Sequence, residues 1–230
     1  MAIQITWLSH AGFIVDVGGL SILIDPYLAG NPLAPVKPDD LAADFILLSH
    51  GHGDHIGDAP AIARRTGATV VANNEIGKWL RKQYGLQKVH TLNPGGGVKL
   101  PFGRVELTIA HHSSSLPDGS YGGEPNGILV LTAEGKVLYH AGDTGAFLDM
   151  QLIGEHGIDL AMLPIGDYYT MGIEGSLRAI ELLKPKAVIP MHYNTFDVIA
   201  QDVTLWAQRV QNETEAKPVV LDPGGCFQLS

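Results

Sequence analysis

The sequence has few of the features that mark secreted, membrane or nucleic-acid-binding proteins. It contains one cysteine, Cys226, which cannot form a disulfide within the chain and so favours a reducing compartment. No apolar run approaches the roughly 20 residues that a membrane-spanning helix needs. The first residues, Met1 to Trp7, lack the basic and long apolar parts of a secretory signal. We therefore expect a cytoplasmic protein with no membrane partner.

Positive charge is also scarce. The 230 residues include 15 Lys and Arg against 24 Asp and Glu, which gives a formal net charge of −9, and no basic cluster is longer than Arg64-Arg65. Binding to nucleic acid depends mainly on clustered cations that neutralise phosphates, so this composition disfavours a nucleic-acid partner. Hydrophobic residues make up 45% of the chain, which is enough for the substantial core of one ordinary domain.

Short apolar runs and amphipathic patterns alternate along the chain. Runs bounded by Gly, Pro and Asp predict strands over residues 3–8, 13–17, 22–24, 45–48, 105–110, 128–131, 160–163 and 187–189. Helical patterns cover residues 59–66, 173–183 and 203–210. The first of these helices has Asp58 as its expected N-cap and Gly67 just past its end. This alternation predicts an α/β layered domain with mixed sheets.

The two halves of the sequence resemble each other. Each contains a predicted hairpin whose second strand ends in an aspartate, Asp25 in one half and Asp143 in the other. Each half then continues to an apolar strand that follows an aspartate, Asp44 or Asp159. Two similar halves that pack their sheets together would bring both sets of strand ends to one edge. We therefore expect a single domain over residues 1–230, built from two similar halves.

One segment combines a buried-type strand with a dense group of metal-binding side chains. After Leu47-Leu48-Ser49, the chain runs His-Gly-His-Gly-Asp-His, so four of the six residues 50–55 can bind a metal ion. The loop at the end of a packed strand holds ligands rigidly, and Gly51 and Gly53 allow tight turns between them. Imidazole with a neighbouring carboxylate is typical of hydrolytic metal sites. Burying so many polar groups without a shared partner would be costly, and a divalent cation supplies one.

This segment resembles the His-x-His-x-Asp-His signature of the metallo-β-lactamase superfamily. The other parts of the family pattern follow in the same order: His112 after a strand, Asp143 in His-Ala-Gly-Asp-Thr, and His192 in Pro-Met-His-Tyr. The resemblance covers most of the chain. It implies the four-layer αββα sandwich of the family, with two mixed β-sheets.

The resemblance also implies the ligands of one or two divalent metal ions. They are His50, His52 and His112 for one ion, Asp54, His55 and His192 for the other, and Asp143 as the bridge. Zinc is the first expectation, with manganese, nickel or iron as alternatives. Asp54 has an alternative role, because in some family members this residue orients or deprotonates the attacking water. His111 and His112 are adjacent, so only one can face the site, and the resemblance favours His112.

The start of the chain carries a narrower resemblance. The segment Trp7-Leu-Ser-His-Ala-Gly-Phe13, together with Ile24-Asp25-Pro26, resembles small bacterial metal-dependent hydrolases grouped with L-ascorbate-6-phosphate lactonase. In that group the early histidine lies near the metals, which suggests that His10 is a catalytic general acid or binds substrate. The alternative is a buried histidine bonded to backbone. Asp25 is expected to hold a ligand histidine through a carboxylate-imidazole hydrogen bond.

These features predict an enzyme that hydrolyses a small-molecule substrate with a metal-activated water, at an ester, lactone or phosphodiester bond. Asp167, Tyr168 and Tyr169 are expected at a strand end, where they would bind substrate or pack at the rim. A non-catalytic metal-binding module and a metal-dependent nuclease are the alternative functions. Association into a homo-oligomer is compatible with the sequence.

Overall fold

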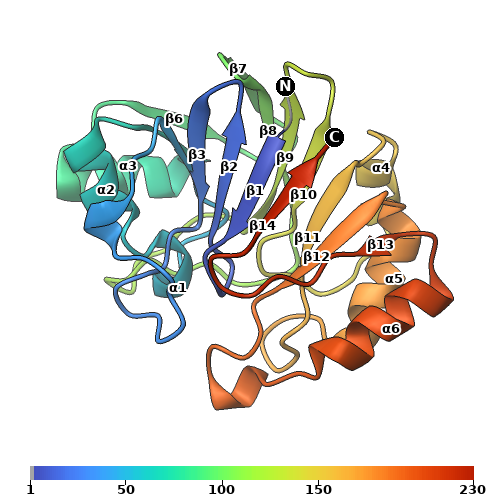
Figure 1. Cartoon of the computed structure of the whole chain (residues 1–230). Helices are drawn as coiled ribbons and strands as arrows, with labels where there is room; N and C mark the ends of the chain where they lie inside the picture. The colour runs from blue at the N-terminus through green and yellow to red at the C-terminus, as the bar shows by residue number, and fades with distance from the viewer. Residues whose placement is uncertain (1–2) are drawn as a thin grey trace.

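The computed structural model describes residues 3–230. Met1 and Ala2, the first two residues of the segment expected to lack a secretory signal, lie outside the described residues. Within the described residues, two sheets of seven strands each face one another (Figure 1). The first sheet has the order β14 (Cys226–Leu229), β1 (Ile3–Trp7), β2 (Phe13–Val17), β3 (Leu20–Ile24), β4 (Phe45–Leu47), β5 (Thr69–Asn73) and β6 (Val89–Leu92). The second has the order β13 (Lys217–Pro218), β12 (Ala187–Met191), β11 (Leu160–Pro164), β10 (Val137–His140), β9 (Asn126–Thr132), β8 (Gly103–Ile109) and β7 (Gly97–Leu100).

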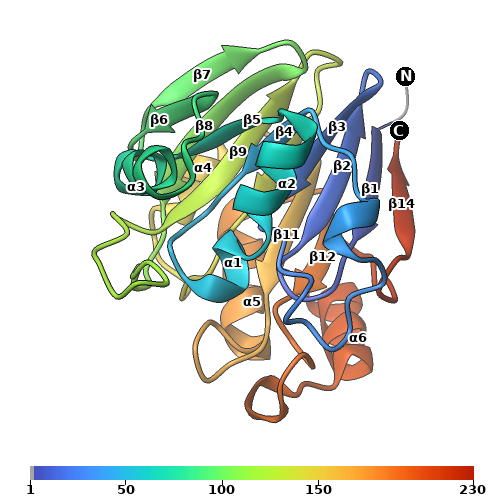
Figure 2. The same ribbon diagram turned by 90° about the vertical axis from the view of Figure 1, so that its left-hand side faces the viewer.

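Helices cover the outer faces of the sheets. They are α1 (Gly53–Ile56), α2 (Ala59–Thr66), α3 (Asn74–Tyr84), α4 (Met150–Gly154), α5 (Ile173–Leu183) and α6 (Val203–Glu213), with short 3-10 turns η1 (Pro38–Asp40) and η2 (Asp197–Ile199). Figure 2 shows α2 and α3 in front of the first sheet, while α5 and α6 lie beyond the second. The predicted αββα sandwich with two mixed sheets is therefore confirmed. None of the described helices is long and apolar enough to span a membrane.

Alternating side chains build two separate cores. In β3 and β4, Ile24 and Leu47 point between the sheets, whereas their neighbours Leu23 and Ile46 pack outward under α2 and α3. Successive residues of a strand face opposite sides, so an unbroken apolar strand serves both layers. Such continuous apolar runs were the main signal for these strands in the sequence.

The order of strand pairing is the same in both sheets. Counted from β14 in the first sheet and from β7 in the second, three antiparallel pairings are followed by three parallel ones. The Asp44 carboxylate accepts a hydrogen bond from the Ser21 backbone at 2.9 Å, and the Asp159 carboxylate accepts one from the Val137 backbone at the same distance. The origin of the domain from two similar halves stays a prediction, which this matching order supports.

One helix boundary differs from its predicted cause. Asp58 precedes α2, but its side chain makes no capping bond to that helix. Its carboxylate instead accepts hydrogen bonds from the backbone amides of Leu28 and Ala29, at 2.8 and 2.9 Å. The loop after β3 competes for the carboxylate, and Pro60 leaves the first turn of α2 with fewer amides to satisfy. Asp58 therefore ties this loop to the start of α2.

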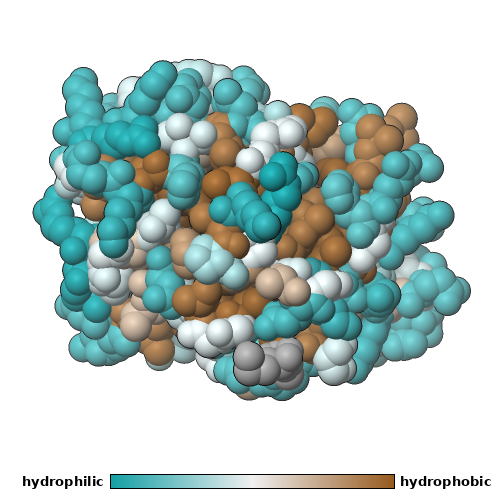
Figure 3. All heavy atoms as spheres, turned by 90° about the horizontal axis from the view of Figure 1, so that it is seen from above, coloured by the Kyte–Doolittle hydropathy of each residue, from teal (hydrophilic) through white to brown (hydrophobic). Residues whose placement is uncertain are grey.

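Apolar surface is found at the end of the sandwich that carries the C-terminus. Figure 3 looks onto this end and shows apolar side chains gathered near its middle, with hydrophilic side chains around them. The loops that carry the predicted metal ligands lie at the opposite, lower end in Figure 1, where α1 follows β4. The predicted metal ligands therefore lie at the end of the sandwich opposite to this apolar surface.

Candidate metal centre

The predicted ligands come from four strand ends and meet in one place. His50, His52, Asp54 and His55 follow β4, His112 follows β8, Asp143 follows β10 and His192 follows β12, and His10 lies in the turn between β1 and β2. Their nitrogen and oxygen atoms form three overlapping groups, each with all its atoms within 4.8 Å of one another. These groups are His50, His52 and His112, then His50, His55 and Asp143, and then His10, Asp54, His55 and His192.

The first group consists of three imidazoles. His50 Nε2 lies 3.0 Å from His52 Nδ1, and the ring of His112 lies 5.1 Å from each of their rings. Burial, followed by charge repulsion from His55, lowers the pKa of His50 well below its usual value, and burial also lowers the pKa of His52 and of His112. These imidazoles are therefore neutral at pH 7 and offer lone pairs to a cation.

Nitrogens of three histidines from different groups lie close to Asp143. Its carboxylate lies 3.3 Å from His55 Nε2, 3.5 Å from His112 Nε2 and 3.1 Å from His192 Nε2. Burial acts against the ionised carboxylate, but the charges of His192 and His55 outweigh it and lower the pKa of Asp143 well below its ordinary value. The same attraction to Asp143 overcomes burial at His192 and raises the pKa of that histidine to about 9.

Several of these atoms are buried without a hydrogen-bond partner. His55 Nε2, His192 Nε2 and Asp143 Oδ1 lack a well-directed hydrogen bond among the described residues, although they lie close together. Buried polar atoms normally have partners, because an unpaired one costs about 1–3 kcal/mol. A divalent cation would satisfy all three at once. The donor set of imidazole nitrogens and carboxylate oxygens therefore fits such an ion.

Asp25 orients one of the histidines from behind. Its carboxylate accepts a hydrogen bond from His55 Nδ1 at 2.8 Å and another from the Ser49 backbone amide at 2.8 Å. Since Nδ1 is occupied in this way, Nε2 of His55 is the nitrogen that faces Asp143. The predicted carboxylate-imidazole hydrogen bond of Asp25 is present and is made to His55, whereas the role of His55 as a ligand stays a prediction. Ser49 is a supporting residue that the sequence analysis missed.

His10 is fully buried and lies behind Asp54. Its Nε2 is 3.1 Å from Asp54 Oδ2, and its Nδ1 is 2.9 Å from the Thr195 hydroxyl. Burial and the nearby charge of His192 lower the pKa of His10 to about 4, so the ring is neutral at pH 7. The Asp54 carboxylate can only accept, so Nε2 donates to it and Nδ1 accepts from Thr195. This geometry suits a residue that positions Asp54, and the alternative of a histidine bonded to backbone is not what the structure has.

His140 supports the loop that carries Asp143. Its Nε2 donates to the Ala11 carbonyl at 2.9 Å, and its Nδ1 accepts from the Gly142 amide at 3.1 Å.

Gly51 is required for a different reason from the tight turn that the sequence predicted. A side chain there would meet the Ser115 carbonyl at 3.0 Å, so close packing, and not a left-handed turn, explains this glycine. Left-handed backbone instead occurs at Ser9, His10 and His192. Strained backbone of this kind is concentrated at functional sites.

The two adjacent histidines face different ways. His112 belongs to the first group, whereas the ring of His111 stacks on Phe147 at 4.7 Å between centroids. The choice of His112 from the sequence agrees with this orientation. We expect His112→Ala to lose at least half of the bound metal and His111→Ala to keep it, as measured by elemental analysis after zinc loading and desalting. The reverse result would exchange their roles.

Most of the candidate ligands border an open cleft of about 460 Å³, with His50 and His55 buried outside its lining. Its lining is formed by His52, Asp54, His112, Ser113, Asp143, Tyr169, His192, Phe196 and Val198. Of the three residues predicted at the rim, Tyr169 lines the cleft, Tyr168 packs against the ring of Tyr169, and Asp167 is not part of the lining. Phe196, Val198 and Thr195 were not anticipated from the sequence.

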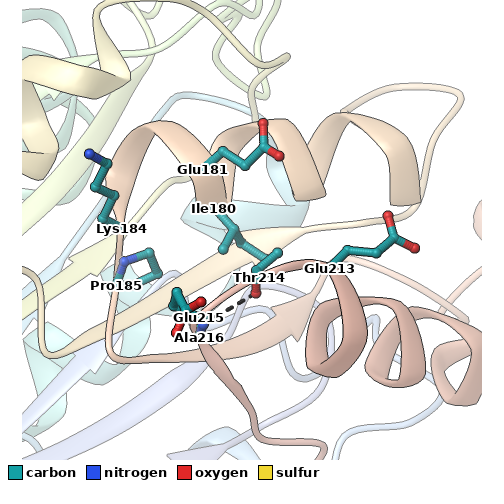
Figure 4. Close-up of a pocket in the computed structure, with 8 residues that line it drawn as sticks. All are labelled: Ile180, Glu181, Lys184, Pro185, Glu213, Thr214, Glu215 and Ala216. Carbon is teal, nitrogen blue, oxygen red and sulfur yellow. Dashed lines mark hydrogen bonds between the residues drawn. The ribbon is translucent and has the colours of Figure 1, made fainter.

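A second cavity, of about 430 Å³, lies between the C-terminal ends of α5 and α6. Figure 4 shows that the charged groups of Glu181, Lys184 and Glu213 point in different directions there. The lining contains no histidine or aspartate. The histidine cleft is therefore the better candidate for a functional site.

Comparison with known proteins identifies the family. The sequence profile of the Beta-lactamase superfamily domain matches residues 4–192. The chain is 44% identical to a UPF0173 metal-dependent hydrolase of Archaeoglobus fulgidus and 45% identical to one of Thermus thermophilus, over 99% of each chain in both cases. The protein belongs to the UPF0173 metal-dependent hydrolases. This membership confirms the predicted superfamily and the prediction of an enzyme, whereas the relation to L-ascorbate-6-phosphate lactonase stays a prediction.

Solved structures agree with this family. Igni18, described as a novel metallo hydrolase of Ignicoccus hospitalis, is 39% identical and matches with a TM-score of 0.90, covering 100% of this chain and 99% of its own. An isothiocyanate hydrolase from Delia radicum gut bacteria matches with a TM-score of 0.77 at 21% identity, over 99% of both chains, and shares the fold. The UPF0173 chain described here thus has the same fold along its whole length as a solved metallo hydrolase.

Proposed function

We propose that this UPF0173 protein hydrolyses a small-molecule substrate at an ester, lactone or phosphodiester bond, with one or two divalent ions bound at the histidine cleft. The observation that carries the proposal is the set of buried, unpaired atoms on His55, Asp143 and His192, of which Asp143 and His192 line an open cleft. When bound, the ions would supply a nucleophilic water at neutral pH and stabilise developing negative charge.

The residues divide naturally between two ions. The neutral group of His50, His52 and His112 suits one ion, His55, His192 and Asp54 suit the other, and the two oxygens of Asp143 point toward both groups. Zinc is the first choice for such nitrogen and oxygen donors, and manganese, nickel or iron would also fit. A single occupied position would still be compatible with hydrolysis.

Asp54 and His10 act as a pair in this proposal. The side chain of Asp54 is one-third exposed and lines the cleft, so it can contact both an ion and the attacking water. Burial works against its ionisation, but the hydrogen bond from His10 and the nearby histidines His192 and His55 outweigh that effect and lower the pKa of Asp54 below its usual range. Asp54 therefore stays ionised and can bind an ion or accept a hydrogen bond from the attacking water, while His10 fixes the direction of its carboxylate.

We expect His10→Ala to keep most of its metal and to lower kcat by about 10- to 100-fold, the typical cost of removing a partner that orients a ligand. Metal content and kcat are measured on the same preparation. Thr195→Val removes only the hydroxyl that fixes the His10 ring, so it should lower kcat in the same direction by a smaller factor. Full activity of His10→Ala would make this histidine structural, and loss of metal would make it a ligand.

Two alternative functions make different predictions. A non-catalytic metal-binding module would bind metal and turn over nothing, and a nuclease would cleave DNA or RNA, although the net charge of −9 opposes binding of either polyanion. A cytoplasmic location and association into a homo-oligomer are further proposals, which fractionation and light scattering would test.

The experiment that tests the proposed function is a screen of the metal-loaded protein against lactones, carboxylic esters, thioesters and phosphodiesters, with single-stranded DNA and RNA included. His50→Ala is the blank, because it removes an internal ligand. Hydrolysis of a small substrate that depends on added zinc or manganese and disappears with chelator supports the proposal. Metal binding with no turnover in any class contradicts it.

A further inference from the structure

One wall of the cleft is apolar and exposed. Tyr169 comes from the loop after β11, and Phe196 and Val198 come from the loop after β12. These three side chains, the apolar wall, are 57%, 40% and 52% exposed. Apolar groups that gather at the mouth of a cleft, beside a few converging polar groups, are typical of ligand-binding sites.

The apolar wall is held in place by backbone hydrogen bonds. The Asn194 amide donates to the Ile199 carbonyl and the Ile199 amide donates to the Phe196 carbonyl, both at 3.0 Å, and the side chain of Ile199 is buried. On the other loop, the Met171 amide donates to the carbonyl of Thr144 at 3.0 Å, next to the candidate ligand Asp143. The backbone that carries these exposed side chains is therefore held next to the candidate metal ligands, which places the wall beside a bound substrate.

Positive side chains are missing from this wall. Among the described residues that line the cleft there is no lysine or arginine, and the only acidic ones are Asp54 and Asp143. A phosphate or carboxylate substituent far from the reacting bond would find no charged partner here, and phosphate recognition usually depends on arginine, lysine or a helix N-terminus. An uncharged alkyl or aryl group would instead bury apolar surface against the wall.

We infer that the apolar wall of Tyr169, Phe196 and Val198 selects neutral carboxylic esters or lactones with an alkyl or aryl acyl group, and not substrates with a charged, phosphorylated substituent. This inference rests on the proposed hydrolytic function and names its substrate class. It separates the substrate of this chain from that of L-ascorbate-6-phosphate lactonase, the enzyme with which the narrower sequence resemblance groups it.

The test uses the zinc-loaded protein and p-nitrophenyl esters of acetate, butyrate and hexanoate, with the monosuccinate ester as the charged member. We expect kcat/KM to rise at least about 10-fold from acetate to hexanoate, the lower end of what added methylenes contribute in an apolar pocket. The monosuccinate should be the slowest of the four. Val198→Ser and Phe196→Ser should flatten the dependence on chain length. Leu152→Ser is the matched control, because Leu152 is 60% exposed on α4 and does not line the cleft.

The possible failures are distinguishable. If the esters are hydrolysed above the His50→Ala blank but chain length has no effect, or monosuccinate is fastest, this inference is overturned and the proposed function stands. If no ester is hydrolysed above the blank, the proposed hydrolysis of esters is contradicted. The affinity of the protein for uncleaved amide analogues then tests the inference. Calorimetric titration should find N-phenylhexanamide bound at least about 10-fold more tightly than N-phenylacetamide, and Val198→Ser should abolish the difference. Equal affinities would overturn the inference.

Discussion

Asp143→Asn is expected to leave the protein folded, to bind at least one zinc ion per chain fewer than the parent protein, and to lose at least about 10³ in kcat/KM. The substitution keeps the shape of the side chain and removes its charge. That charge lies within 3.5 Å of Nε2 of His55, His112 and His192, where it is buried and faces both ligand groups. A bound ion stabilises charge in the transition state by several kcal/mol, so losing it has a large effect on rate.

Asp159→Asn is the matched control for that variant. Asp159 is also a buried aspartate of the second sheet, but it accepts a hydrogen bond from the Val137 amide and pairs with Lys186 at 2.8 Å, away from the histidines. We expect it to lower the free energy of unfolding by about 1–3 kcal/mol and to keep its metal. Elemental analysis and chemical denaturation separate the two effects. If Asp143→Asn retains a full complement of zinc, Asp143 is not a ligand.

The metal-binding residues could be found in the sequence because their pattern is local. Four of the seven candidate ligands lie in residues 50–55, and the other three follow strands whose apolar runs are easy to see. The candidate ligands follow β4 of one sheet and β8, β10 and β12 of the other, and these strand ends lie at one edge of the sandwich, so element prediction was sufficient to bring them together. The apolar wall and Thr195 have no such pattern. They lie on an irregular loop whose position depends on how η2 packs through Ile199.

Parts of the fold were missed for two different reasons. The segment β5–α3–β6 was not predicted, although Asn73 caps α3 by accepting from the Ile76 amide and Gly85 ends it in the left-handed conformation. Those capping signals were present in the sequence. Strand β14 is different, because it is defined by pairing with β1 from the far end of the chain, with Leu229 opposite Ile3. Local patterns carry no information about such a pairing.

The two candidate ion positions differ in the number of protons that a bound ion must displace. This difference gives the second large expected effect. His50, His52 and His112 have lowered pKa values and are neutral at pH 7, so an ion can bind them without displacing a proton. At His55, burial is outweighed by Asp143 and Asp25, which raise its pKa well above 6.5, and the pKa of His192 is raised to about 9. Both are protonated at pH 7 in the metal-free protein, so the ion at this position must displace two protons.

The sign of the pH dependence follows from these shifts. Raised pKa values stabilise the metal-free fold below pH 6.5, and the contribution of His192 is lost as the pH rises through about 9. Zinc affinity at the position of His55 and His192 should therefore increase with pH between 6.5 and about 9, by about 10-fold per unit for the proton on His192 and by more where His55 also releases its proton. Affinity at the position of His50, His52 and His112 should change much less over the same range.

Zinc titrations in competition with a chelator of known affinity, at pH 6.5 and 8.5, would measure this difference. We expect one tightly bound ion at the lower pH and two at the higher, with the second affinity raised by at least about 10². Calorimetry in buffers of different ionisation enthalpy should count about two protons released by the second ion and about none by the first. Two ions whose affinities rise in parallel with pH would contradict the assignment of charged histidines to one position, since both positions would then displace the same number of protons.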